Sequence, residues 1–320
     1  MPVPLKIVAL GGGHGLAASL RALRRITSDV VAIVGVSDNG GSSGRLRNEF
    51  DVIPPGDLRM ALTALCSDDE WGQLWARTLQ HRFQGHGDLG GHAVGNLLIT
   101  ALWQQSDDIV AGLDAVSALL GARGRVLPVS LQPLDVVADV RTGDGTLVEV
   151  SGQVQVATAI GKVEALRLVP ADAAATPEAL TAMTEADLIV MGPGSWFTSV
   201  INHLTLPDVL EHLVQSNARK LLVSNLCSQT GETENFTPAE HLDVVADLHP
   251  DLRFDAVVVD SSLADASMAQ AANRLGAELL SARLHVAGNP HLHDPELLAK
   301  CISGFLESAL PTLEGDRAWQ

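Results

Sequence analysis

The chain has 320 residues, of which 46% are hydrophobic, and a formal net charge of −17. This composition supports one large α/β domain or two smaller ones, and no apolar run is long enough to span a membrane. A chain this acidic repels a nucleic-acid backbone, so we expect neither nucleic-acid binding nor membrane insertion. The N-terminus lacks the apolar core of a secretory signal, and Cys66, Cys227 and Cys301 have no paired spacing. We therefore expect a protein of the reducing cytoplasm.

Apolar runs of strand length alternate with helical patterns through most of the chain. Uninterrupted apolar runs are typical of parallel strands that are covered on both faces. Strands are predicted at residues 5–10, 30–36, 126–129, 187–191, 220–223, 254–259 and 279–286. Helices are predicted at residues 56–66, 70–80, 92–105, 108–119 and 295–306, with others starting near Pro177, Pro207, Thr237 and Leu263.

Between residues 134 and 169 the pattern changes to an alternation with a period of two. Asp144-Gly145 stands there between two valine-rich runs, which is a strong signal for a β-hairpin. This segment has too little apolar bulk for a core of its own. The sequence therefore predicts a single domain over residues 1–320, with a Rossmann-like, doubly wound, mostly parallel sheet and a small antiparallel β-hairpin insertion at residues 134–169.

Five polar, glycine-containing segments stand where predicted strands end. They are residues 11–15, 37–45, 54–57, 192–195 and 224–232. In an open α/β sheet the carboxyl ends of the strands border the ligand crevice. Glycine there lets a ligand approach bare backbone, and a helix N-terminus offers free N–H groups to an anion. The sequence therefore predicts one crevice that holds a phosphate-bearing small molecule.

The first of these segments has four glycines in five residues and lies where a phosphate loop is expected. Read from Gly13, it fits the loose dinucleotide fingerprint, with Ala18 in the last position and Asp38 at about the right distance. No Lys-Ser/Thr pair follows it, so it is not a Walker A loop. The structural alternative is a tight strand-to-helix turn, although a turn alone needs fewer glycines.

Charged and hydroxyl side chains in the next two segments suggest anion binding. Ser42 and Ser43 are candidates to donate to phosphate or sugar oxygens, and Arg45 and Arg47 to neutralise phosphate charge. A surface loop is the alternative interpretation. Asp57 stands at a predicted helix start, where the macrodipole favours a carboxylate. The functional alternative is that Asp57 binds ligand hydroxyls or a metal.

Three histidines, His81, His86 and His92, invite a zinc interpretation. Their spacings match no common zinc pattern, so we interpret His92 and Asn96 as part of the crevice wall.

The last two segments are candidates for cradling phosphate and reading the rest of the ligand. Gly194 and Ser195 end a predicted strand, with a plain turn as the alternative. The order G-x-S-x-G is absent, so a serine nucleophile is not expected. Further along the chain, Asn225, Gln229, Thr230 and Glu232 can read a base or sugar by hydrogen bonds, or cap a helix in part.

These segments predict a binding site, and they contain no recognisable nucleophile or acid–base pair. No catalytic residue and no resident metal is therefore assigned. The candidate ligand-binding residues are Gly11, Gly12, Gly13, His14, Gly15, Asp38, Gly40, Gly41, Ser42, Ser43, Arg45, Asp57, His92, Asn96, Gly192, Gly194, Ser195, Asn225, Gln229, Thr230 and Glu232.

Taken in order, the segments resemble the gluconeogenesis factor family, the YvcK-like proteins of the CofD-like superfamily. The resemblance covers nearly the whole chain and makes residues 1–320 one CofD-like domain. The motifs that carry it are residues 9–16, 37–47, 54–59, 91–98, 191–195 and 229–233.

The resemblance implies a Rossmann-like protein that binds UDP-sugars such as UDP-N-acetylglucosamine. It also implies a link to cell shape and peptidoglycan synthesis during growth on gluconeogenic carbon sources. The related CofD branch consists of 2-phospho-L-lactate transferases, which act with a nucleotide-activated phospholactate and magnesium. An Arg-His-Asp expected near the C-terminus reads Leu292-His293-Asp294 here, which removes one expected phosphate contact unless Arg283 replaces it.

The leading hypothesis is a cytoplasmic UDP-sugar-binding regulator. Its expected partners are UDP-N-acetylglucosamine or a related UDP-sugar, cell-wall synthesis proteins, and a second copy of the chain. The alternative is a magnesium-dependent transferase in which Asp38 or Asp57 holds Mg²⁺. A dinucleotide-dependent oxidoreductase is a third hypothesis and rests on the loose fingerprint alone.

Overall fold

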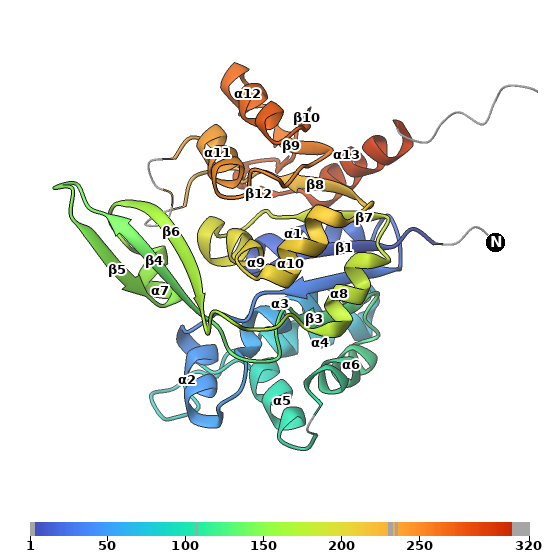
Figure 1. The fold of residues 1–320 in the computed structure, drawn as a ribbon. Coiled ribbons are helices and arrows are strands. Elements are labelled where there is room, and N and C mark those ends of the chain that lie inside the picture. Colours follow the sequence, from blue (N-terminus) through green and yellow to red (C-terminus); the bar gives the residue numbers. More distant parts are fainter. Residues whose placement is uncertain (1–3, 107, 230–232, 234–235, 309–320) are drawn as a thin grey trace, which may run out of the picture.

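A seven-stranded sheet in the order β10-β9-β8-β7-β1-β2-β3 forms the centre of the computed structural model, which describes residues 4–106, 108–229, 233 and 236–308 (Figure 1). All its neighbouring strands are parallel. The strands are β1 Ile7–Gly11, β2 Val30–Val34, β3 Arg125–Pro128, β7 Leu188–Met191, β8 Arg219–Val223, β9 Ala256–Asp260 and β10 Glu278–Ala282. The predicted α/β class with a mostly parallel sheet is confirmed.

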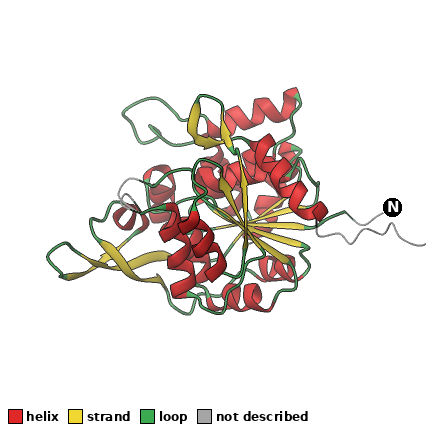
Figure 2. Ribbon diagram, turned by 90° about the horizontal axis from the view of Figure 1, so that it is seen from above, coloured by secondary structure: helices red, strands yellow, loops and turns green. Residues whose placement is uncertain are grey.

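Helices cover both faces of this sheet (Figure 2), which is why its strands are continuous apolar runs. Every residue of β1 and β9 is buried. On one face α1 packs against α3 and α13, and elsewhere α11 packs against α12. The helices are α1 Gly13–Leu23, α2 Gly41–Phe50, α3 Pro55–Leu65, α4 Glu70–Gln80, α5 Val94–Trp103, α6 Ile109–Leu120, α8 Pro177–Thr184, α9 Asn202–Leu204, α10 Pro207–Gln215, α11 Pro238–Leu248, α12 Ala266–Arg274 and α13 Pro295–Ser308, with a π-helix η1 at Trp196–Ile201.

The strand order reverses direction between β1 and β7. From β1 the chain continues to β2 and β3 on one side, whereas from β7 it continues to β8, β9 and β10 on the other. This is the topological switch point, where the loops that leave the two central strands diverge and leave a crevice at the carboxyl edge.

The segment that we predicted as a β-hairpin insertion contains three strands and a short helix. They are β4 Asp135–Arg141, β5 Leu147–Ser151, α7 Gln153–Ala157 and β6 Lys162–Val169. The strands pair antiparallel in the order β5-β4-β6, and the predicted Asp144-Gly145 turn joins β4 to β5. Figure 1 shows this sheet projecting from the side of the domain where the central strands end.

Two local expectations differ from the structure, and a third agrees with it. Residues 41–45, which we interpreted as part of a polar loop, form the first turns of α2. The strand predicted at residues 279–286 is divided into β10 and the short β11 His285–Val286, which pairs with β12 Asn289–His293. The helix predicted near Thr237 does begin there, because Thr237 and Glu240 form a capping box.

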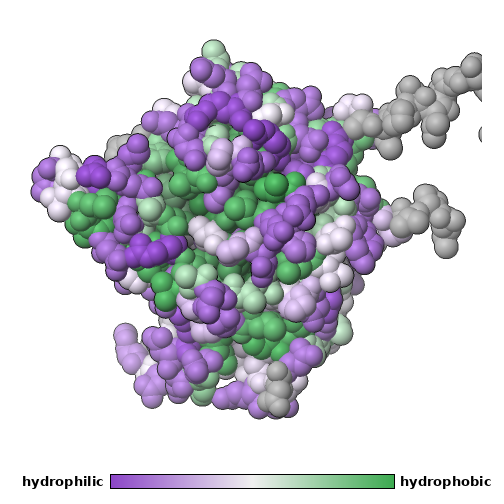
Figure 3. All heavy atoms as spheres, viewed as in Figure 1, coloured by the Kyte–Doolittle hydropathy of each residue, from purple (hydrophilic) through white to green (hydrophobic). Residues whose placement is uncertain are grey.

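The surface mixes polar and apolar residues over the face that carries α10 (Figure 3). Scattered exposed apolar residues are normal for a globular protein. Within the described residues, no helix combines the length and apolar character needed to cross a membrane.

Candidate functional site

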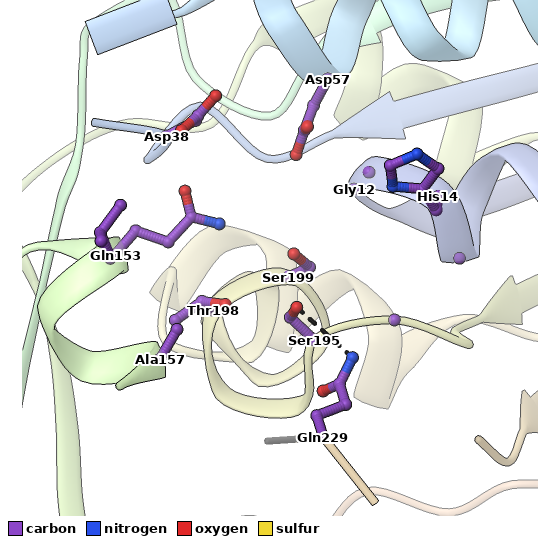
Figure 4. Close-up of a pocket in the computed structure, with 14 residues that line it drawn as sticks. Gly12, His14, Asp38, Asp57, Gln153, Ala157, Ser195, Thr198, Ser199 and Gln229 are labelled. Atoms are coloured by element: carbon purple, nitrogen blue, oxygen red, sulfur yellow. Dashed lines mark hydrogen bonds between the residues drawn. The ribbon is translucent and has the colours of Figure 1, made fainter. Parts of the chain in front are cut away.

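A cavity of about 370 Å³ lies at the switch point, and all five predicted segments contribute to its wall (Figure 4). The loop after β1 and the loop after β7 face each other across it, as expected for the carboxyl edge of a doubly wound sheet. The sequence-predicted residues in its lining are Gly12, Gly13, His14, Gly15, Asp38, Asp57, Gly194, Ser195 and Gln229.

The first glycine loop brings the N-terminus of α1 to this cavity. Gly12 is the N-cap and has no side chain to cap the helix, and the first turn carries no acidic residue. The N–H groups at a helix N-terminus need acceptors, and the helix dipole favours negative charge there. The Gly13 N–H donates to the carboxylate of Asp57. Because Asp57 already occupies this donor, the loop can present only the other N–H groups of the first turn to a ligand anion.

Two of these glycines are also required by close packing. A Cβ on Gly15 would lie 2.1 Å from the carbonyl oxygen of Pro193, and one on Gly12 would lie 2.5 Å from Asp57 Oδ2. The loops after β1 and β7 thus approach each other backbone to backbone. Packing accounts for part of the glycine run, in addition to the ligand access that we predicted.

The amide of Asn225 positions the loop after β7. Its Nδ2 donates to the carbonyl of Gly194 at 2.9 Å, and its Oδ1 accepts from the Gly194 N–H at 2.9 Å. We predicted that Asn225 binds a base or sugar. In the structure both ends of its amide are instead hydrogen-bonded to the backbone of Gly194. Gln229 does line the cavity, where its Oε1 accepts from the Trp196 N–H at 3.1 Å. Thr230 and Glu232 lie outside the described residues.

Four residues predicted to bind phosphate or form the crevice wall do not line the cavity. Ser42 Oγ is 3.0 Å from His92 Nδ1 and 3.0 Å from Asn96 Nδ2, and all three residues are buried. This cluster joins the start of α2 to α5. Arg45 donates to the carbonyl oxygens of Asp88 and Gly90, so its guanidinium holds a neighbouring loop.

The other residues that we predicted to bind the ligand, described next, also do not line the cavity. Ser43 packs against α3, because a Cβ on Gly56 would lie 2.2 Å from its Oγ. Gly11 ends β1, and Gly192 follows β7 with a φ of +73°. Gly40 is the N-cap of α2 and Gly41 is its first residue. Arg283 and Leu292, where we considered a lost or replaced phosphate contact, are both exposed, and neither lines the cavity.

Two carboxylates, Asp38 and Asp57, face the cavity together. Burial, followed by the negative charge of Asp38, raises the pKa of Asp57 to about 7. The Gly13 N–H and the guanidinium of Arg59 act in the opposite direction. Arg59 is itself buried, which together with the charge of Arg82 lowers its pKa to about 10. At neutral pH the pair can thus accept hydrogen bonds, donate one, or bind a divalent cation with loss of the Asp57 proton.

Part of the lining was not predicted from the sequence. The π-helix η1 contributes Thr198 and Ser199, and the insertion contributes Gln153, Val154 and Ala157 from α7. This hydroxyl pair follows Gly194-Ser195 after two intervening residues, which is a signal that could have been used. The α7 residues follow a strand within the period-two segment and carry no local signal for a site. Short π-helical turns are frequent at functional sites.

Comparison with known proteins gives concordant results. The family model described as 2-phospho-L-lactate transferase CofD matches residues 7–286. A Mycobacterium tuberculosis protein provisionally named gluconeogenesis factor is 47% identical over 306 residues, which cover 93% of this chain and 89% of the relative. The gluconeogenesis factor of Halalkalibacterium halodurans is 40% identical over 241 residues, which cover 75% of this chain and 73% of the relative. The crystal structure of a UPF0052-family protein from Bacillus halodurans has a TM-score of 0.84 at 33% identity, covering 95% of this chain and 100% of that one.

The fold, with its crevice at the switch point, is that of the CofD class of α/β proteins. Within this class the chain belongs to the gluconeogenesis factor family. The resemblance that the loop motifs indicated is therefore confirmed.

Proposed function

We propose that this protein is a cytosolic regulator that binds a UDP-sugar, such as UDP-N-acetylglucosamine, in the cavity at the switch point. The observation that carries the proposal is the N-terminus of α1, which begins at the first glycine loop and opens onto a cavity of about 370 Å³. Helix N-termini of this kind favour phosphate, and cavities from about 300 Å³ upward accommodate small ligands.

The names of the relatives support a role in gluconeogenic growth. We propose that the UDP-sugar reports the supply of cell-wall precursor, and that the liganded protein acts on cell shape and peptidoglycan synthesis through a cell-wall synthesis protein. This proposal needs no chemical step in the cavity. The segments described above contain no Ser nucleophile in an elbow sequence, so a binding role is the simpler assignment.

UDP-N-acetylglucosamine is expected to stabilise the purified protein against heat. A ligand that binds only the native state at 100 times its Kd adds about 2.7 kcal/mol, which raises the Tm of a chain of this size by roughly 5 °C. The measurement is a thermal-unfolding panel of UDP-sugars, with free N-acetylglucosamine as a control that should cause no shift. If no UDP-sugar raises the Tm at millimolar concentration, the proposal is wrong.

The pair formed by Asp38 and Asp57 favours a second candidate, a magnesium-dependent transferase like that of the CofD branch. Magnesium prefers oxygen ligands and is commonly held by one or two carboxylates together with substrate phosphates. Over the described residues, no group of three or more His, Cys, Asp or Glu side chains could hold a metal ion. The two carboxylates therefore fit a Mg²⁺ that arrives with a phosphate-bearing substrate, whose charge it would neutralise.

Under this second candidate, turnover of a nucleotide-activated donor is expected to require Mg²⁺ and to be abolished by Asp57→Asn. Product formation is followed by chromatography with and without the metal. Absence of turnover across phospholactate-type donors would leave the regulatory proposal alone.

A further inference from the structure

The insertion supplies one wall of the cavity through its short helix α7. Asn39, in the loop after β2, holds this helix with both ends of its amide. Its Oδ1 accepts from the Val154 N–H at 3.2 Å, and its Nδ2 donates to Gln155 Oε1 at 3.1 Å. The side chain of Val154 also packs on this loop, where a Cβ on Gly40 would lie 3.0 Å from Val154 Cγ2. The position of α7 relative to the cavity is thus fixed by contacts outside the insertion.

Gln153 is the polar residue that α7 places in the cavity lining. Figure 4 shows its amide pointing into the cavity on the same side as Asp38, with Gly12 and His14 on the other side. The Oε1 atom of Gln153 is buried and accepts no hydrogen bond from the residues that the structure describes. A buried acceptor without a donor destabilises the unliganded protein, because it has lost its hydrogen bond to water. A ligand that brings an O–H or N–H group to this atom would remove this destabilisation.

The two sides of the cavity differ in hydrogen-bonding character. The side formed by the first glycine loop offers backbone N–H donors at the start of α1. The other side offers acceptors, namely the carboxylate of Asp38 and the amide oxygen of Gln153, while the carboxylate of Asp57 lies between the two sides, where it accepts from the Gly13 N–H (Figure 4). A phosphate has only acceptor oxygens at neutral pH and is repelled by carboxylates, so it belongs on the donor side. Uracil has one N–H donor, whereas the ribose and the terminal sugar each have several O–H donors, so the acceptor side matches a sugar ring, and comparison of UDP with UDP-N-acetylglucosamine separates these two.

We propose that Gln153 is a specificity-determining residue that accepts a hydrogen bond from the sugar of the bound UDP-sugar. In this arrangement α7 of the insertion binds the sugar, and the loops after β1 and β7 bind the phosphates. This inference rests on the proposed function and deepens it, because it assigns the sugar to one side of the cavity.

The test compares Gln153→Leu with the unchanged protein by isothermal titration calorimetry against UDP-N-acetylglucosamine and against UDP. Loss of one buried hydrogen bond is expected to weaken UDP-N-acetylglucosamine binding about tenfold. Binding of UDP, which has no sugar beyond its ribose, should change less than about twofold. Gln105→Leu makes the same chemical change at an exposed residue beyond α5 and should alter neither affinity. A thermal-unfolding scan of each variant verifies that it is folded.

Two results would overturn the inference. If Gln153→Leu binds both ligands as tightly as the unchanged protein, its amide does not contact the ligand. If it loses affinity for UDP and UDP-N-acetylglucosamine equally, Gln153 contacts the nucleotide or shapes the cavity, and the sugar assignment is wrong. A protein that binds UDP but gains no affinity from the sugar would also contradict it. Failure of the unchanged protein to bind any UDP-sugar is a separate outcome, which removes the proposed function itself and this inference with it.

Discussion

Gly15→Ala is expected to destabilise the protein by about 3 kcal/mol, because the added methyl group has no space between two backbone segments. The Cβ would lie 2.1 Å from the Pro193 carbonyl oxygen and 2.6 Å from Gly194 Cα. Neither atom belongs to a flexible side chain, so the loops after β1 and β7 must move apart. The gain of up to about 1 kcal/mol that alanine brings to a helix is smaller than this clash. Urea unfolding at neutral pH measures the difference.

Gly304→Ala is the matched control. Gly304 lies within α13 with nothing within 4 Å of its added Cβ. This substitution should stabilise the protein by about 0.5–1 kcal/mol, since it removes only backbone freedom from the unfolded chain. Because Gly15 and Gly194 both line the cavity, Gly15→Ala should also weaken UDP-sugar binding. A Gly15→Ala protein as stable as the unchanged one would show that the two loops tolerate separation.

The sheet could be predicted from the sequence because its strands are buried on both faces. The run Leu188–Met191 is fully buried, and such a run has few other stable placements. The glycine clusters also indicated where the strands end, because their backbone conformations favour glycine. Gly13 adopts a φ of +59° at the start of α1, a conformation that other residues rarely adopt. Strand burial and glycine conformation depend on residues close together in the chain, so they can be predicted from the sequence.

Which polar residues line the cavity and which hold neighbouring loops could not be predicted, because this depends on contacts between segments far apart in the sequence. Asn225 and Gly194 are separated by 31 residues, and their hydrogen bonds exist only once β7 and β8 are paired. Ser42 was predicted to contact phosphate, yet the formation of α2 directs its hydroxyl to His92, which is 50 residues away. The contribution of Gln153 is the extreme case, since the hydrogen bonds that hold α7 beside the cavity join it to Asn39, at least 115 residues earlier in the chain.

Asp57→Asn is expected to stabilise the metal-free protein at pH 8 by on the order of 2–4 kcal/mol and to have little effect near pH 4. Burial and the charge of Asp38 raise the pKa of Asp57 from 3.8 to about 7. Between these two values the native state keeps a proton that the unfolded chain has released. The contribution of Asp57 to the free energy of unfolding therefore falls as pH rises through this window, whereas asparagine does not titrate.

Urea unfolding of both proteins in EDTA, from pH 4 to pH 8, measures this difference. Most other carboxyl groups titrate alike in both proteins and cancel in the comparison. A difference that stays constant with pH would show that folding does not raise the pKa of Asp57. The same variant should bind UDP-N-acetylglucosamine more weakly, because an amide is a poorer acceptor than a carboxylate for a sugar hydroxyl. Higher stability combined with lower affinity is the outcome expected when two carboxylates are held together for a ligand at the expense of the unliganded fold.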